Sequence, residues 1–185
     1  MKGGLTKKCW LLLLFGLAPL SHGVVCNDVQ PAADAPQETA QFHFMVGQHE
    51  VALHAWTGQA WTPPRPQGAR WNGWYGLAGL AVYDEWIDPD PVRGGLGVNV
   101  RTYDAESAEW KMMWVSTTNM QVQDLRAKLI DGVLTMWQVY PERPGWKAEF
   151  EPLDEHRWQR VDYNKDDQGQ WQPGFKLVAS RIGCP

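Results

Sequence analysis

The chain of 185 residues has only three cysteines and five histidines, and its formal net charge at pH 7 is −4. Without an excess of positive charge, no basic surface for DNA or RNA is expected. The cysteines form no Cys-x-x-Cys pair, which disfavours a structural zinc site. No Gly-x-Ser-x-Gly segment is present, so serine-hydrolase chemistry has little support.

The N-terminus has the features of a secretory signal peptide. Three lysines among the first eight residues precede the apolar segment 10–20, and small residues stand before a cleavage point after Gly23. The apolar segment is shorter than the roughly 20 residues that a membrane-spanning helix needs. No integral membrane segment is expected after cleavage, and the protein is predicted to be periplasmic or secreted. The predicted organisation is a signal peptide over 1–23, a flexible lead over 24–36 and a single domain over 37–185.

Cleavage after Gly23 would leave two cysteines, Cys26 and Cys184, one near each end of the mature chain. Two cysteines in an oxidising compartment favour one disulfide bond. Lipidation of Cys26 is an alternative, although Val25 stands where a lipoprotein signal has a small residue. Two free thiols would be expected only if the chain stayed in a reducing cytosol.

Short apolar and β-branched runs separated by turn signals dominate the chain from residue 48 onward. A short helix is predicted before them, ending at Gly47. No helical segment of about 10–15 residues separates the runs, which excludes parallel βαβ units. About ten strands are expected, over 48–57, 71–80, 81–87, 97–103, 110–116, 122–130, 133–139, 146–151, 157–163 and 171–181. The predicted fold is all-β, an antiparallel up-and-down barrel, with a sandwich as the alternative.

Several segments of the chain resemble a family of small secreted lipocalin-like barrel proteins of unknown function. They are FHFMVGQH at 42–49, YDEW at 83–86, RTYD at 101–104 with the tryptophans that follow it, and RWQRVDY at 157–163. The resemblance covers 38–183 and implies a calycin-type barrel, but no activity. First strands of this type usually read Gly-x-Trp, whereas this chain has Gly47-Gln48-His49. Either His49 or another tryptophan would therefore plug the barrel floor.

The twelve tryptophans are the best indication of a ligand. Indole carries an N–H group that needs a partner, and interiors that need only filling favour Leu, Ile and Val. Tryptophans on successive strands predict an aromatic-lined cavity for a small apolar or aromatic ligand, with an arginine at its polar end. The predicted ligand-binding residues are Trp86, Arg101, Tyr103, Trp114, Trp137, Trp158 and Arg160. The alternative is that the indoles, including Trp110 and Trp146, simply fill the interior.

Two further functions remain open. Asp84 and Glu85 are adjacent, so they point to opposite faces of a strand, and the inward one could pair with Arg101. Such a carboxylate is the weak catalytic candidate for a cofactor-free isomerase, cyclase or lyase. The other possibility is an envelope structural or glycan-binding module with a filled core. Four tryptophans flank a proline-rich loop and suit such a surface: Trp56, Trp61, Trp71 and Trp74.

Metal binding has weak support. His43 and His49 are the candidate ligands, and their spacing with His54 does not place three imidazoles on one strand face. No metal and no cofactor are predicted, with haem as a minor possibility. The sequence does not indicate an oligomeric state.

Overall fold

The computed structural model describes residues 30–92, 94–118 and 120–184. The predicted signal peptide and Cys26 lie outside the described residues, so the cleavage after Gly23 and the disulfide between Cys26 and Cys184 stay predictions. The elements in chain order are η1 (Gln37–Met45), β1 (Gly47–Ala55), β2 (Ala69–Gly76), η2 (Leu77–Gly79), β3 (Ala81–Asp88), β4 (Gly95–Asp104), β5 (Glu109–Ser116), β6 (Val122–Ile130), β7 (Val133–Tyr140), β8 (Trp146–Pro152), β9 (Arg157–Lys165) and β10 (Trp171–Gly183).

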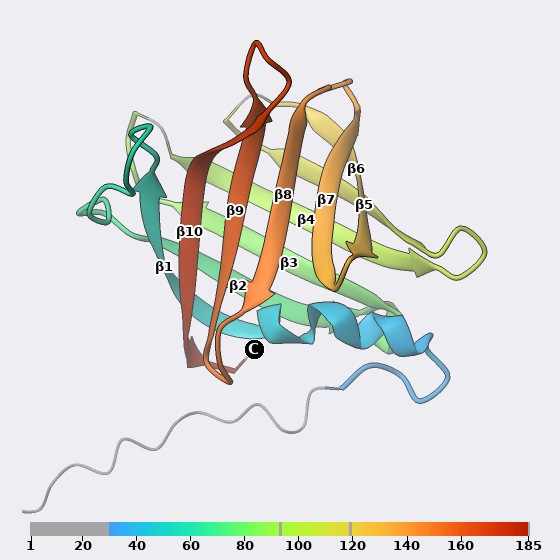
Figure 1. The fold of residues 1–185 in the computed structure, drawn as a ribbon. Coiled ribbons are helices and arrows are strands. Elements are labelled where there is room, and N and C mark those ends of the chain that lie inside the picture. Colours follow the sequence, from blue (N-terminus) through green and yellow to red (C-terminus); the bar gives the residue numbers. More distant parts are fainter. Residues whose placement is uncertain (1–29, 93, 119, 185) are drawn as a thin grey trace, which may run out of the picture.

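The strands form one closed barrel in the order β1-β10-β9-β8-β7-β6-β5-β4-β3-β2 (Figure 1). Each strand runs antiparallel to its neighbours in sequence, and β1 pairs with β10 to close the sheet. Closure leaves no long sheet edge unpaired. The predicted all-β, up-and-down barrel of ten strands with a short N-terminal helix is confirmed.

One predicted strand, 71–80, is shorter at its end than expected. β2 ends at Gly76, and Leu77 and Ala78 follow with positive φ angles of 48° and 55°. This left-handed backbone cannot continue a strand, so the chain turns through η2 instead.

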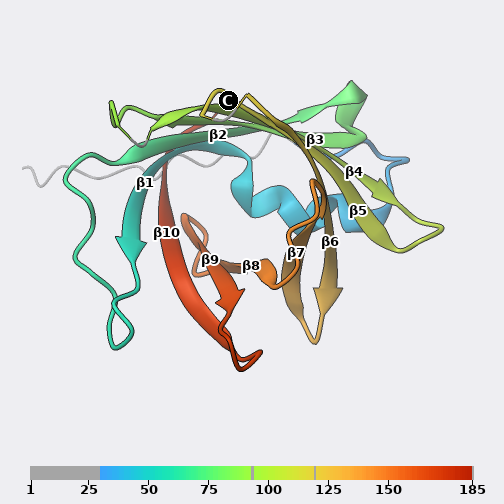
Figure 2. The same ribbon diagram turned by 90° about the horizontal axis from the view of Figure 1, so that it is seen from above.

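The helix η1 closes one end of the barrel, and a view along the strands shows it framed by them (Figure 2). Its Phe42 is fully buried and packs edge-on against Trp110 and Phe150, with ring centroids 4.8 and 5.6 Å apart. The Trp110 indole N–H donates to Gln41 Oε1 at 3.0 Å. The turns that follow β1, β3, β5, β7 and β9 surround the opposite end. Within the described residues, no helix is long and apolar enough to cross a membrane.

His49 lies in the floor of the barrel. It is fully buried, its ring packs edge-on against Trp158 at 5.9 Å, and its Nδ1 lies 3.3 Å from the Trp71 carbonyl oxygen. Trp158 also contacts the rings of Phe44 at 5.6 Å and Trp71 at 5.2 Å. His49 and a tryptophan of another strand therefore share the role of floor plug.

Candidate functional site

A cavity of about 300 Å³ lies inside the barrel above this floor. Its apolar walls are formed by Trp71, Trp86, Trp114, Leu125, Met136, Trp146, Phe150, Phe175 and Leu177, and its polar lining by Asp88, Asn99, Arg101, Gln123, Gln138, Arg143, Arg160 and Asp162. Side-chain alternation along each strand brings these residues to the inner face. A cavity of about 150 Å³ admits benzene, so this one has room for two fused rings or for one ring with a substituent.

Three indoles, from β2, β3 and β5, form one wall of the cavity. Trp71 and Trp86 are direct cross-strand partners, and their rings meet edge-on at 5.5 Å. Opposite Trp86 on β4 stands Gly97, and a side chain there would overlap the Trp114 ring. The glycine therefore leaves the space in which the Trp114 indole lies.

Arg101 and Asp84 form a buried ion pair at the bottom of the cavity. Asp84 is opposite Asn99 in the β3–β4 ladder, so Arg101 is its diagonal neighbour on the same inner face. The Arg101 Nη1 contacts Asp84 Oδ2, and the two side chains are 1% and 0% exposed. The Arg101 guanidinium also lies 4.9 Å above the centre of the Phe42 ring. Burial, and then repulsion from Arg160, lower the pKa of Arg101 to about 9, so it stays protonated at neutral pH.

Arg160 is more accessible than the deeper Arg101, whereas Arg143 lies over the Trp146 ring in the segment between β7 and β8. Arg160 and Asp162 lie on the same face of β9, and the Arg160 Nε and Nη2 donate to the two Asp162 carboxylate oxygens at 2.6 and 2.8 Å. A guanidinium has five N–H groups, so three remain outside this bidentate pair. Both side chains line the cavity and are partly exposed. Arg160 is thus held in place while N–H groups are left for a further acceptor.

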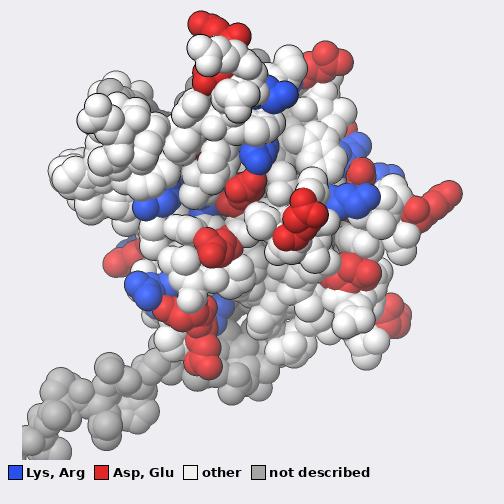
Figure 3. Space-filling model, in the orientation of Figure 1, with Lys and Arg blue, Asp and Glu red and all other residues white. Residues whose placement is uncertain are grey.

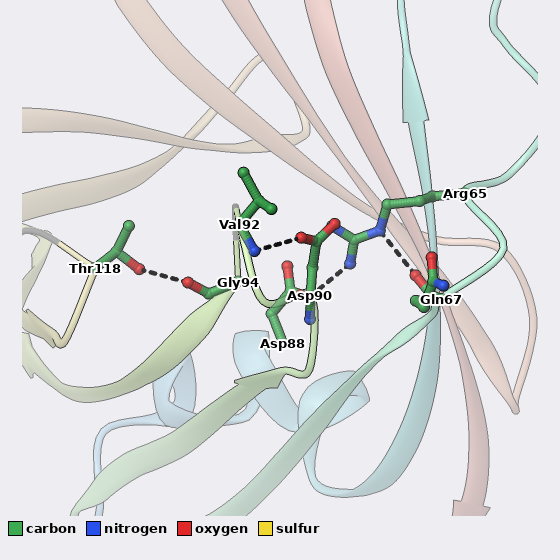
Figure 4. Close-up of polar contacts among 7 residues, drawn as sticks. All are labelled: Arg65, Gln67, Asp88, Asp90, Val92, Gly94 and Thr118. Carbon is green, nitrogen blue, oxygen red and sulfur yellow. Dashed lines mark hydrogen bonds and ion pairs between the residues drawn. The ribbon is translucent and has the colours of Figure 1, made fainter.

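An ion-pair cluster organises the rim at the open end (Figure 4). Arg65, in the segment between β1 and β2, binds Asp88 Oδ1 at 2.6 Å and Asp90 Oδ2 at 3.1 Å. Its Nε donates to the Gln67 carbonyl at 2.8 Å. Asp88 also lines the cavity, so Arg65 joins the long β1–β2 segment to the cavity wall.

Three buried polar atoms on the cavity wall have no hydrogen-bond partner among the described residues. They are Asn99 Oδ1, Trp71 Nε1 and Arg101 Nε. An unpaired buried donor or acceptor costs about 1–3 kcal/mol.

The structure separates the predicted ligand residues into three groups. Trp86, Arg101, Trp114 and Arg160 line the cavity. Trp158 lies in the floor beneath it, and Tyr103 packs against Trp110 at 5.6 Å near the closed end. Trp137 lies on the outer face of β7, because the alternation of that strand turns Leu134, Met136 and Gln138 inward.

The expected catalytic pair divides as the strand geometry requires. Asp84 faces inward, where it pairs with Arg101, and it is not among the residues that line the cavity. Glu85 faces outward and accepts a hydrogen bond from Asn72 at 3.2 Å. Neither carboxylate therefore lies on the cavity wall, where an acid–base catalyst would have to be.

One surface assignment was wrong, and several cavity residues were missed. Trp71, expected at a glycan-binding surface, is 3% exposed and lines the cavity, because it shares the inner face of β2 with Ala69 and Gly73. Asn99 was missed, although it stands two residues before Arg101 and so shares its face. The same rule would have found Gln123 from Leu125.

The two candidate metal ligands lie apart from the cavity. His43 stacks on Tyr75, with Nδ1 3.0 Å from the hydroxyl, and burial followed by repulsion from Arg181 lowers its pKa. Burial likewise lowers the pKa of His49, to about 4, with a smaller effect of Arg181. Among the described residues, no three His, Cys, Asp or Glu side chains are grouped so that they could hold a metal ion.

Comparison with known proteins gives a remote likeness in structure. No family model matches the chain, and no curated protein matches its sequence. The S-type phycobiliprotein lyase CPES from Guillardia theta is similar in structure, with a TM-score of 0.49 and 12% identity over 78% of this chain and 92% of that chain. The lipocalin-like family suggested by sequence segments stays a resemblance.

Proposed function

We propose that this protein is an exported carrier that binds a small aromatic carboxylate inside its barrel. The cavity of about 300 Å³, with indole walls and the Arg160 guanidinium, is the observation that carries the proposal. Ligand pockets of this kind combine apolar walls with a few fixed polar groups. On the face seen in Figure 3, acidic and basic side chains are interspersed. This face therefore has no continuous basic patch that would bind a large polyanion.

Arg160 rather than Arg101 is the proposed anchor for the carboxylate. Arg101 is fully buried, paired with Asp84 and stacked on Phe42. Arg160 is partly exposed to the cavity, and its pairing with Asp162 fixes the plane of the guanidinium. Arginine matches the two oxygens of a carboxylate, and hydrogen bonds between charged groups are about twice as strong as neutral ones.

The aromatic body would lie against the indole wall that Trp86 and Trp114 form. Asn99 and Trp71 also line the cavity, but their unpaired Oδ1 and Nε1 atoms are buried within the wall. The contact of the carboxylate with Arg160 is therefore the polar interaction that the proposal specifies.

The test is calorimetric titration of the mature protein with 2-naphthoate and with its neutral analogue 2-naphthamide. Arg160→Gln should weaken naphthoate binding about ten- to hundredfold, the equivalent of a charged hydrogen bond of about 1.5–3 kcal/mol, and leave naphthamide unchanged. Arg126→Gln is the matched control, since Arg126 pairs with Asp124 on its own strand but on the outer face. Equal loss in both variants, or no binding of either compound to the wild type, would refute the proposal.

A further inference from the structure

β7 and β8 pair over only part of their length. These strands pair through Leu134–Phe150, Thr135–Glu149 and Met136–Ala148. Toward the open end, no pairing between them continues among the described residues, although β7 stays paired to β6 as far as Tyr140 and β8 to β9 from Trp146 onward. The two strands therefore part beside the upper cavity, and we call this place the β7–β8 seam.

Trp146 stands at the seam and faces both sides of the wall. It is the first residue of β8, it is 7% exposed, and it lines the inner cavity together with Met136 and Gln138. It also lines a groove of about 480 Å³ on the outside of the barrel. Here the cavity and the groove are separated by one indole rather than by a hydrogen-bonded ladder.

The outer groove combines apolar side chains with the exposed carboxylate of Asp131, and the lysine that lines it is already engaged. Ile130 and Val133 are 46% and 38% exposed, and they line it with Trp137. Lys147 also lines it, but its ammonium is 2.5 Å from Glu149 Oε1 and 4.9 Å above the Trp171 ring. A groove whose cation is already engaged suits an aliphatic chain better than a second acid.

The depth of Arg160 sets the length of a ligand that could reach this groove. Arg160 pairs across the ladder with Phe150, which stands four residues below Trp146 on β8. Its guanidinium is held by Asp162, which pairs with Ala148 two residues below Trp146. At about 3.3 Å per residue, the carboxylate anchor therefore lies roughly 7–13 Å below the seam. A short aromatic acid would remain inside, whereas an acid with a tail on the far side of its ring would extend to Trp146.

We infer that the natural ligand is an aromatic acid with an apolar tail, which leaves the barrel through the β7–β8 seam past Trp146 and lies in the outer groove along Trp137. This inference rests on the proposed function and adds the substrate class to it. The cavity holds the acid and the ring, and the groove holds the aliphatic chain. Trp137 is then a ligand contact from outside the barrel.

A series of 4-alkylbenzoates, from methyl to dodecyl, tests the inference by calorimetry. In the wild type, each methylene beyond the length that reaches the seam should lower the Kd by up to about fourfold, the gain expected for one buried CH₂. Trp137→Ala should abolish this gain for long tails and leave the Kd of the methyl and ethyl compounds unchanged. Trp74→Ala is the control, because Trp74 also lies on the outer face but on β2, stacked on Tyr83.

The outcomes separate the two proposals. If short benzoates bind and long tails bind no more tightly, or if Trp137→Ala and Trp74→Ala act alike on long tails, the inference is overturned and the proposed function stands. If no benzoate of any length binds, both fail. Thermal unfolding of each variant checks that it is folded.

Discussion

Replacing Asp84 by asparagine should lower the free energy of unfolding by about 3–5 kcal/mol, because it leaves a buried guanidinium without its counter-charge. Asp84 and Arg101 are 0% and 1% exposed, so water cannot replace the lost partner. The pKa of Arg101, about 9, keeps it charged at pH 7. For a chain of this size the loss corresponds to a fall in Tm of roughly 6–20 °C.

The same reasoning predicts that removing both charges is far less harmful than removing one. Asp84→Leu combined with Arg101→Met should recover most of the stability, since apolar groups of similar volume often replace a buried ion pair at little cost. The measurement is urea unfolding at pH 7, followed by circular dichroism, for Asp84→Asn, for Asp84→Leu and Arg101→Met singly, and for the double variant. Asp124→Asn, which breaks a partly exposed pair with Arg126, is the control and should cost less than about 1 kcal/mol. The argument is refuted if Asp84→Asn behaves like the control, or if the double variant loses the sum of the single losses.

Three further predictions follow from the floor, the cavity wall and the chain ends. His49 has a pKa of about 4 in the folded protein and 6.5 when exposed. The free energy of unfolding should therefore fall by roughly 3 kcal/mol as the pH drops from above 6.5 toward 4. Urea unfolding midpoints across this range measure the loss, and His49→Gln should make the free energy of unfolding less dependent on pH. Gly97→Ala should displace the Trp114 ring and cost about 1–3 kcal/mol, seen as a lower Tm and altered tryptophan fluorescence; unchanged values would contradict the packing described. Intact mass spectrometry of protein from the periplasm or medium should give the chain without residues 1–23 and two hydrogens lighter, whereas a lipid adduct on Cys26 would show lipidation instead.

The residues that line the cavity were predictable from sequence to the extent that strand alternation fixes a face. Trp86, Arg101, Trp114 and Arg160 were predicted, and each lies on the cavity wall. Alternation states which residues share a face but not which face is inside. Trp137 shows the consequence, since it was predicted with the others and points outward.

Contacts between distant strands decided the rest. The sequence predicted that the inward member of Asp84 and Glu85 could pair with Arg101, but only the register of β3 against β4 decided that this member is Asp84. That Trp71 is buried depends on which face of β2 is inside. That Trp158 belongs to the floor rather than the wall depends on η1, which brings Phe44 against it.

The sequence alone determined the class of fold. Short alternating runs, turn residues between them and the absence of long helical segments are local properties, and together they predict an antiparallel all-β fold, a barrel or a sandwich. The pairing of β1 with β10 decided for the closed barrel. The depth of each side chain, the height of the floor and the parting of β7 from β8 were decided only by the tertiary structure. The physical reason is that inward direction, ladder register and cavity volume depend on pairs of strands, and no single strand carries that information.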